Sequence, residues 1–374
     1  MHGLFCRHVH ASLYEKFCQD RIRSDGSLSP GGLRLGERPA PAAAAGRSAA
    51  ADVAPPAPPV SAAQLEQLVD FVHSSRRLLV LTGAGCSTES NLPDYRSPSG
   101  AYSRGFKPMT HQLFMSGPAA QSRYWSRSFA GWHQFSGVQP NAAHEALARL
   151  QRGNWAAGGF ITQNVDRLHQ KAGAAGVLEI HGTTHEVICM GCGEVTPREP
   201  FQTRLADLNP EAAAAVALAA VSSDDAGRLV DPGEDGGLQA ARNPDGDVEV
   251  SRQPDGDLEL PGGGEGFVVP PCERCGGVLK PNVVFFGDAI PPARAKLALA
   301  AAEACDALLV VGSSLMVWSA FRLAKAASGA RARVAIVTAG PTRADDLAEF
   351  KIEARAGEVL ARLAAQPELG LPRL

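Results

Sequence analysis

The chain has 374 residues, of which 45% are hydrophobic and 20% are charged, and its formal net charge is −3. This length accommodates one large domain or two smaller ones, each with a sizeable core. The near-neutral charge gives no argument for a nucleic-acid partner, and the sequence has no apolar run of about 18 residues that would predict a membrane-spanning helix.

Residues 1–60 are not predicted to fold. Residues 38–59 consist mostly of alanine and proline, a composition typical of a flexible or polyproline linker. Basic residues upstream favour an organelle transit peptide, whereas the acids among them argue against one. A cleaved targeting segment and a disordered extension therefore stay open as interpretations.

The first predicted strand is the apolar run at residues 78–81, which has the length and aliphatic bulk of a buried parallel strand. Gly83 and Gly85 follow it, and Ser87 and Thr88 stand where a helix would be capped. A strand, a glycine turn and a helix N-terminus together present free N–H groups to a diphosphate. A tight turn without a ligand is the alternative, because Thr88 replaces the third glycine of a G-x-G-x-x-G motif.

Short apolar strands alternate with helices along most of the chain. Further strands are predicted at residues 159–162, 177–180, 283–286, 307–311 and 334–337, and helices at residues 62–74, 121–135, 140–153 and 292–305. This alternation predicts an α/β fold with a Rossmann-like, doubly wound parallel sheet. Ligands of such sheets sit at the carboxyl ends of the strands, so we expect these ends to converge on the glycine turn.

The 121–135 helix carries five aromatic residues, which we expect to face the core; the wall of an apolar channel is the alternative. Residues 222–266 form an acidic insert with twelve acids and three arginines, a local charge of 3 − 12 = −9. The motif NPDGDVEV at residues 243–250 recurs there as QPDGDLEL at residues 253–260. Its Asp-Gly turns predict a pair of small hairpins or a disordered acidic loop.

Four of the eight cysteines form two C-x-x-C pairs, Cys189 with Cys192 and Cys272 with Cys275. Four thiolates in two such pairs predict one closed, structural Zn²⁺ site and a reducing compartment. The spacer of 272 − 192 − 1 = 79 residues is long for a compact zinc ribbon, and the acidic insert accounts for much of it. A redox-active C-x-x-C is the alternative.

Three polar residues stand at predicted strand ends. His181 precedes Gly182, and a histidine that titrates near neutral pH is a natural general base, although a packed structural histidine is the alternative. Asn164 and Asp166 offer an amide and a carboxylate suited to holding a ribose or an attacking water, or else they cap a loop.

The order of the motifs resembles that of the sirtuin family of NAD-dependent protein-lysine deacylases. GAGCSTES, PDYRS, TQNVDRLH, IHG, the two C-x-x-C pairs and GSSL follow one another, and the likeness runs from about residue 65 to residue 363. PDYRS and GSSLMVWSA are most similar to class II, the branch of the mitochondrial sirtuin four. The resemblance implies a catalytic domain over residues 61–374, with Rossmann-like parts at about 61–185 and 277–365 and a zinc-binding module at about 186–276.

The resemblance also implies roles for individual residues. The catalytic residues would be His181, as general base, with Asn164 and Asp166. Residues 283–285 would pair with an acyl-lysine peptide. The contacts to NAD would come from Gly83, Ala84, Gly85, Ser87, Asp94, Tyr95, Arg96, Tyr102, Gln163, Asn164, Val165, Asp166, Gly312, Ser313, Ser314, Thr338, Ala339, Gly340 and Ala356.

The implied reaction consumes NAD as a co-substrate: the acyl oxygen attacks the nicotinamide ribose, nicotinamide leaves, and His181 draws a proton from a ribose hydroxyl. The products would be free lysine and O-acyl-ADP-ribose. Three residues depart from the family pattern: Thr338 replaces an asparagine, Ala356 a cysteine and Asn91 a glycine, which asparagine can replace at positive φ.

Other functions stay open. The same NAD site would serve a protein mono-ADP-ribosyltransferase or the removal of longer acyl groups, and a non-catalytic NAD- and zinc-binding interaction module is the alternative from another class. A dehydrogenase is disfavoured by the broken glycine motif. We expect acyl-lysine proteins as partners, with no direct nucleic acid and no membrane. The resemblance to the sirtuin four branch favours the mitochondrial matrix over the cytoplasm or another reducing compartment.

Overall fold

The computed structural model describes residues 59–224, 251–252 and 258–372. The predictions for residues 1–58 and for the first copy of the acidic repeat lie outside the described residues. Around the second copy, Ser251 pairs with Glu259 and Arg252 with Leu258 in one small antiparallel hairpin, β6 (Ser251–Arg252) and β7 (Leu258–Glu259). Among the described helices, none combines the length and the apolar character that crossing a membrane requires.

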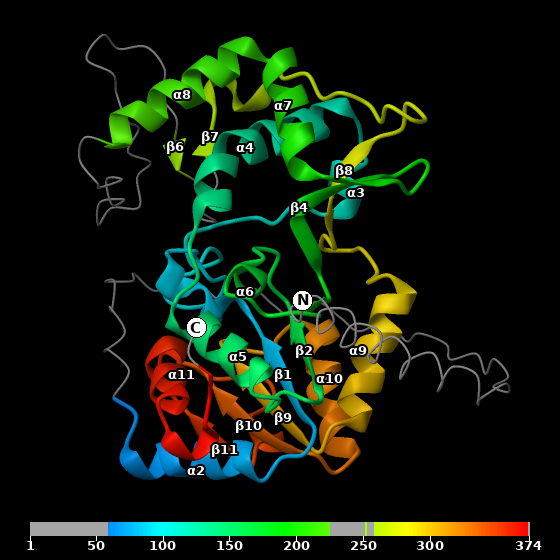
Figure 1. Ribbon diagram of the computed structural model, residues 1–374. Coiled ribbons are helices and arrows are strands. Elements are labelled where there is room, and N and C mark those ends of the chain that lie inside the picture. The colour runs from blue at the N-terminus through cyan, green and yellow to red at the C-terminus, as the bar shows by residue number, and fades with distance from the viewer. Residues whose placement is uncertain (1–58, 225–250, 253–257, 373–374) are drawn as a thin grey trace, which may run out of the picture. The chain divides into compact units, whose positions relative to one another are not determined.

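A six-stranded parallel sheet organises the part of the molecule that we call the large lobe (Figure 1). The strand order is β11-β10-β9-β1-β2-β3, and every pair in it is parallel. The strands are β1 (Leu78–Thr82), β2 (Gly159–Thr162), β3 (Leu178–Glu179), β9 (Ala307–Val311), β10 (Arg333–Val337) and β11 (Phe350–Ile352). The predicted doubly wound sheet is confirmed, and its order reverses between β1 and β9, where such folds bind dinucleotides.

Both faces of this sheet are covered by helices, because its central strands are apolar on both sides. Leu78 and Val80 pack into one buried cluster and Leu79 and Leu81 into another. The first cluster includes residues of α2 (Ala62–His73), α5 (Ala142–Arg152) and α11 (Ala356–Ala364), and the second includes residues of α9 (Pro292–Ala304) and α10 (Trp318–Gly329).

A three-stranded antiparallel sheet, ordered β5-β4-β8, organises the small lobe. Its strands are β4 (Gly182–Cys189), β5 (Val195–Pro197) and β8 (Leu279–Val283), and its helices are α3 (His111–Phe114), α4 (Pro118–Gly137), α7 (Arg198–Leu208) and α8 (Pro210–Asp224). Trp125 and Phe129 of α4 lie in a third buried cluster with Phe201 of α7. The expectation that the aromatic helix faces a core is therefore confirmed.

The strand predicted at residues 283–286 is wrong. Strand β8 ends at Val283 and belongs to the small antiparallel sheet. Beyond it, Asp288 donates its N–H to the carbonyl of Phe285 at 3.0 Å, and its carboxylate accepts the Phe285 N–H at 3.1 Å. These two bonds fold residues 285–288 into a turn, which turns the Phe285 ring into the small-lobe core.

The helix predicted after the glycine turn is also wrong. Two short 3₁₀ turns, Ala84–Cys86 and Thr88–Ser90, stand in its place, and the Ser87 side chain makes no capping bond to them. Asn91 then takes a left-handed conformation with φ 62°, as predicted for this residue, and Pro93 follows without an N–H to continue a helix. A helix dipole therefore does not contribute to ligand binding at this turn.

Candidate functional site

The carboxyl ends of the parallel strands are joined by backbone hydrogen bonds. After four of the strands, the first residue donates its N–H to the last residue of a neighbouring strand: Gly83 to Val311 at 3.0 Å, Gly312 to Val337 at 2.9 Å, Gln163 to Thr82 at 3.0 Å and Ile180 to Thr162 at 3.0 Å. The structure thereby brings the segments 83–87, 163–166 and 312–314 and His181 to one edge of the sheet. The expected convergence of strand ends is confirmed.

Glycines allow two loops to meet where the sheet order reverses. Gly85 donates its N–H to the carbonyl of Gly312 at 2.9 Å. A Cβ on Gly83 would lie 2.8 Å from the Cβ of Ser313, and one on Gly312, which has φ +59°, would lie 2.2 Å from the Cys86 nitrogen. The glycine motif therefore serves the contact between loops at the position where a dinucleotide binds in such folds.

Ser87 lies at the centre of a buried polar cluster. Its hydroxyl donates to the Asp166 carboxylate at 2.7 Å and accepts from the Asn164 amide at 3.1 Å. The same amide donates to the carbonyl of Gly83 at 3.2 Å. Burial raises the pKa of Asp166, against the N–H bond from Leu168 and the bond from Ser87, which lower it. The segment 163–166 is therefore fixed to the glycine turn by side-chain bonds.

Two buried histidines extend this cluster. The Asn141 N–H donates to Nδ1 of His144, so the neutral ring carries its proton on Nε2 and donates to the Ser87 hydroxyl at 3.3 Å. Burial lowers the pKa of His144 to about 4, and it also holds the pKa of His169 well below its ordinary value. Both rings are therefore neutral at physiological pH.

Cys86, His144 and His169 also lie close enough together to be considered as metal ligands. Both nitrogens of His144 already take part in hydrogen bonds, and His169 Nε2 bonds the Thr82 hydroxyl at 2.9 Å. Burial, with the nearby carboxylates of Asp166 and Glu89, raises the pKa of the Cys86 thiol. His169 Nδ1 has no hydrogen-bond partner among the described residues. The neutral Cys86 thiol and the fully bonded His144 ring nevertheless fit a buried hydrogen-bond network better than a metal centre.

His181 follows β3 and is partly buried. Its Nδ1 lies 3.1 Å from the carbonyl oxygen of Gln163, and its Nε2 lies 2.8 Å from the hydroxyl of Ser319. Gln163 itself is fixed, since its side-chain amide donates to Ser313 at 2.7 Å and to the Thr82 carbonyl at 3.1 Å. Burial lowers the pKa of His181, the bond to Gln163 opposes this effect, and the charge of Arg294 adds to it.

The loop with Asp94, Tyr95, Arg96 and Tyr102 is held by bonds of its own. The Asp94 carboxylate accepts from the Ser97 hydroxyl at 2.6 Å, and Tyr102 donates its N–H to the carbonyl of Tyr95 at 3.0 Å. The Arg96 guanidinium lies over the Tyr102 ring at 5.3 Å. These contacts give the loop a compact form.

The remaining predicted NAD contacts lie at neighbouring strand ends. Thr338, Ala339 and Gly340 follow β10, and Thr338 donates its N–H to Ile352 of β11 at 3.1 Å. Ala356 is the buried first residue of α11. The next residue, Gly357, donates its N–H to the Glu89 carboxylate at 2.6 Å, which joins the start of α11 to the glycine turn. Val165 accepts from the N–H and the hydroxyl of Thr184 in β4.

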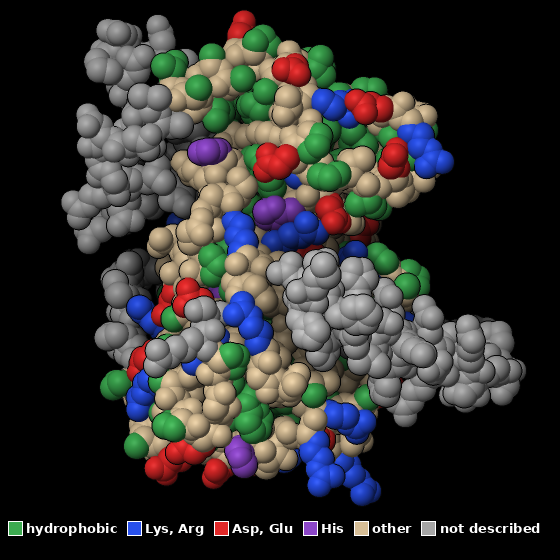
Figure 2. All heavy atoms as spheres, in the orientation of Figure 1, with side chains coloured by type: hydrophobic (Ala, Val, Ile, Leu, Met, Phe, Trp, Pro, Cys, Tyr) green, Lys and Arg blue, Asp and Glu red, His purple; other side chains and the backbone are tan. Residues whose placement is uncertain are grey.

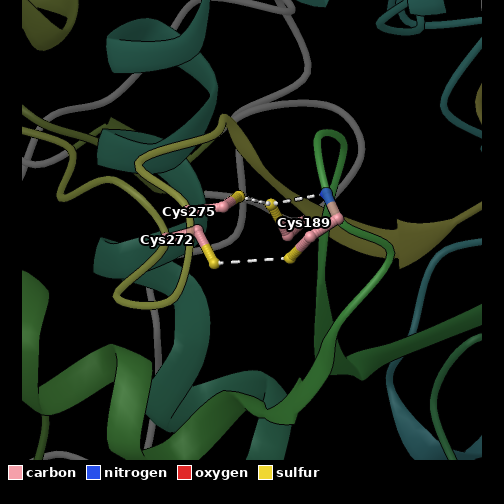
Figure 3. Close-up of side chains that lie close together, drawn as sticks. Cys189, Cys272 and Cys275 are labelled. Atoms are coloured by element: carbon pink, nitrogen blue, oxygen red, sulfur yellow. Dashed lines mark hydrogen bonds between the residues drawn. The ribbon is translucent and has the colours of Figure 1, made fainter.

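The two cysteine pairs meet in the small lobe. Figure 3 shows Cys189, at the end of β4, facing the loop that carries Cys272 and Cys275. The Cys189 and Cys275 sulfurs are 3.4 Å apart, those of Cys192 and Cys272 are 3.9 Å apart, and all four lie within 4.8 Å of one another. Tetrahedral zinc, with Zn–S bonds of about 2.3 Å, holds its sulfurs about 3.8 Å apart. The four thiols therefore fit one zinc ion.

Backbone N–H groups stabilise the thiolate form of one of these cysteines, Cys189. Cys192 and Gly191 direct their N–H groups at the Cys189 sulfur, at 3.5 and 3.3 Å. These bonds lower the pKa of the Cys189 thiol to about 6, and the bond from Cys192 has the largest effect. Thiolates rather than thiols bind zinc, so the turn favours the ligating form.

The family profile described as "Sir2 family" matches residues 83–319, which include the glycine turn, His181 and all four cysteines. The chain belongs to the Sir2 family. The expectation drawn from its motifs is thereby confirmed.

Named relatives extend along most of the chain. It is 46% identical over 322 residues to the NAD-dependent protein deacylase SRT2 of Arabidopsis thaliana, covering 86% of this chain and 82% of the relative. It is 45% identical to an NAD-dependent protein deacetylase of Xanthomonas axonopodis, covering 81% and 92%. It is 42% identical to the NAD-dependent protein lipoamidase sirtuin-4, mitochondrial, of Bos taurus, covering 82% and 87%.

Solved structures show the same fold. A Sir2 enzyme matches with 29% identity and a TM-score of 0.57, covering 82% of this chain and 97% of that chain. A Sir2 protein with a deacetylated p53 peptide and 3'-O-acetyl-ADP-ribose matches with 27% identity and a TM-score of 0.58, covering 80% and 96%. A Sir2–p53 peptide–NAD⁺ complex matches with 26% identity and a TM-score of 0.55, covering 80% and 96%.

Sequence reasoning did not assign a site role to His144, His169 or Ser319. His144 lies on the apolar face of α5, beside buried leucines at helical spacing, and that position marks it as buried. His169 stands in the quoted TQNVDRLH motif. Ser319 stands in the quoted GSSLMVWSA motif, but its contact with His181 could not be predicted, because it joins residues 138 positions apart.

Proposed function

We propose that this protein removes acyl groups from protein lysines with NAD as co-substrate, releasing nicotinamide and O-acyl-ADP-ribose. The observation that carries the proposal is the position of His181. In a Sir2-family chain, its ring is oriented by the Gln163 carbonyl at 3.1 Å, beside the edge where the strand ends meet. The relatives named as NAD-dependent protein deacylases and deacetylases support the proposal.

We propose that NAD lies along the carboxyl edge of the large sheet, held by the loops after β1, β2, β9 and β10. When bound, it supplies the nicotinamide leaving group and the ribose that accepts the acyl group. The amide of Asn164 is committed to Ser87 and Gly83, so its carbonyl oxygen would be the group presented to the ligand. The loop of residues 94–102 would cover the nicotinamide and keep water out.

His181 would act as the general base through Nε2. A carbonyl can only accept, so the contact with Gln163 requires the proton on Nδ1 and leaves the lone pair on Nε2. Burial lowers the pKa of the ring, which keeps it neutral and ready to take a proton at physiological pH. Activity should therefore fall on acidification, as His181 becomes protonated.

The acylated peptide would bind beside residues 283–285, which follow β8. Val284 donates its N–H to the His181 carbonyl at 2.8 Å, so this segment lies next to the general base. Both basic and acidic side chains are present on the face shown in Figure 2. The identity of the acyl group that is removed stays open, since the relatives include deacetylases and a lipoamidase.

We also propose the mitochondrial matrix as the location. The bovine relative is named as mitochondrial, and the basic residues near the N-terminus are typical of a transit peptide. Expression of the full chain in eukaryotic cells, followed by fractionation and sequencing of the mature N-terminus, tests this. An uncleaved cytoplasmic product would contradict it.

The decisive experiment is nicotinamide release from NAD with a panel of acyl-lysine peptides. We expect release that depends on the peptide, appears together with O-acyl-ADP-ribose, and is lost in His181→Ala. His133→Ala, at an exposed position of α4, is the matched control and should retain activity. Peptide-independent loss of NAD, or no loss with any acyl group, would overturn the proposal. Transfer of labelled ADP-ribose to protein would indicate the transferase instead.

A further inference from the structure

The hydroxyl of Ser319 is the second hydrogen-bond partner of the His181 ring. It lies 2.8 Å from Nε2, on the side of the ring opposite the Gln163 contact. Ser319 is the second residue of α10, so the helix backbone fixes its position. The ring is therefore held at both nitrogens, by a backbone carbonyl after β2 and by a side chain at the start of α10.

The two contacts determine which group is the donor in each hydrogen bond to the His181 ring. Because the Gln163 carbonyl requires a proton on Nδ1, Nε2 of the neutral ring is an acceptor and Ser319 must donate to it. A hydroxyl can rotate, so it can also accept from Nε2–H once the ring is protonated. A hydrogen bond to a charged group is about twice as strong as one between neutral groups, so this second arrangement favours the protonated ring.

We propose that Ser319 is a positioning residue for His181. It holds the ring in the tautomer whose basic nitrogen is Nε2, it yields this nitrogen to the substrate hydroxyl, and it accepts a hydrogen bond from Nε2 after proton transfer. The proton moves from the substrate hydroxyl to Nε2, and Ser319 changes from donor to acceptor without gaining or losing a proton. The catalytic part of this inference rests on the proposed function, whereas the hydrogen bonding does not.

Among the described residues, one charged side chain shifts the pKa of His181. Arg294 of α9 is the charged residue whose field acts on His181, and like burial it disfavours the protonated ring. The bond to the Gln163 carbonyl favours the protonated ring. The Ser319 hydroxyl would add to this effect when it rotates and accepts from Nε2–H. Removing the hydroxyl should therefore move the titration of His181 to lower pH.

The test that does not need activity is nuclear magnetic resonance of protein labelled with ¹⁵N-histidine, with His181 assigned from its absence in His181→Ala. We expect the Nδ1–H tautomer in the wild type and a lower titration midpoint in Ser319→Ala. Ser319→Thr, which keeps the hydroxyl, should restore the wild-type midpoint. Ser328→Ala, at the far end of the same helix, is the matched control. Equal midpoints in wild type and Ser319→Ala would overturn the proposal.

The kinetic test measures nicotinamide release over pH. We expect Ser319→Ala to lower kcat by about tenfold, the factor that corresponds to one hydrogen bond, with the KM for NAD unchanged. The acidic limb of its profile should move to lower pH. A wild type without activity would defeat the proposed function and leave the magnetic resonance result to decide on Ser319. An active wild type with an unaltered Ser319→Ala profile would defeat the positioning role alone.

Discussion

One buried hydroxyl joins the residues that the proposed reaction uses. Ser87 bonds Asp166, Asn164 and His144, which come from the loop after β2 and from α5. Each of these groups is buried, and a buried polar atom without a partner costs free energy. The geometry of the site therefore depends on a residue that transfers no proton in the reaction.

We expect Ser87→Ala to lower the free energy of unfolding by about 1–3 kcal/mol, because it leaves buried partners without a hydrogen bond. Urea unfolding measures this change, and nicotinamide release should fall with it. Ser90→Ala is the matched control, since the Ser90 hydroxyl is buried in the same loop and has no hydrogen-bond partner among the described residues. Equal losses in the two variants would contradict the assigned role of Ser87.

His144 should make stability depend on pH. Its pKa is lowered by burial to about 4 in the folded protein, against about 6.5 in an unfolded chain. Between these values the unfolded state binds a proton that the folded state does not. The free energy of unfolding is therefore highest above pH 6.5 and falls by up to about 3 kcal/mol as the pH drops towards 4.

Substituting His144 by glutamine removes this titration. We expect the stability of His144→Gln to fall less steeply between pH 6.5 and 4 than that of the wild type, because glutamine takes up no proton. Urea unfolding at closely spaced pH values measures the difference. Parallel curves for the two proteins would show that His144 is not the group responsible.

Among the elements, the two cysteine turns connect strands that are distant along the chain. Cys189 ends β4, and Cys272 and Cys275 precede β8, its antiparallel neighbour. A metal bound by all four cysteines would therefore fasten the small sheet at one end.

We expect about one zinc per chain and its loss in Cys192→Ser. Hydrogen exchange should then become faster in β4 and β8, while β1 and β9 of the large sheet stay protected. Elemental analysis and mass-spectrometric hydrogen exchange measure the two effects. Cys305→Ala, which removes a buried thiol at the end of α9, should keep the zinc. Full zinc content in Cys192→Ser would exclude the four-cysteine site.

The sequence predicts elements well where burial alone decides them. The apolar runs at β1 and β9 are buried on both faces, so composition was sufficient to identify them. The prediction of a helix after Gly85 is wrong, because Asn91 and Pro93 end the regular backbone within a few residues. The prediction of a strand at residues 283–286 is wrong, because two hydrogen bonds between Asp288 and Phe285 fold these residues into a turn.

For the whole molecule, the meeting of the strand ends follows from the alternation of strands and helices, and it could be predicted. The individual contacts could not. The pairs Ser87–His144 and Ser319–His181 depend on how α5 and α10 pack beside the sheet, and no local pattern encodes that packing. The motifs thus indicate which segments form the site, and the fold determines which atoms touch.

The assembled sheet edge should also respond as one unit to NAD. A ligand that binds only the folded state stabilises it by about 2.7 kcal/mol at one hundred times its Kd. We therefore expect NAD to raise the midpoint of thermal unfolding, and Gly312→Ala to remove this rise. A Cβ at Gly312 would lie 2.2 Å from the Cys86 nitrogen and would require φ +59° of an alanine, so the loops after β1 and β9 must separate.

The matched control is Gly329→Ala at the end of α10, where an added Cβ meets nothing within 4 Å. It should keep both the wild-type midpoint and the full shift with NAD. Gly312→Ala should unfold at a lower temperature without ligand, because the separated loops lose the bond between Gly85 and Gly312. A full NAD shift in Gly312→Ala would mean that the ligand binds away from the point where the sheet order reverses.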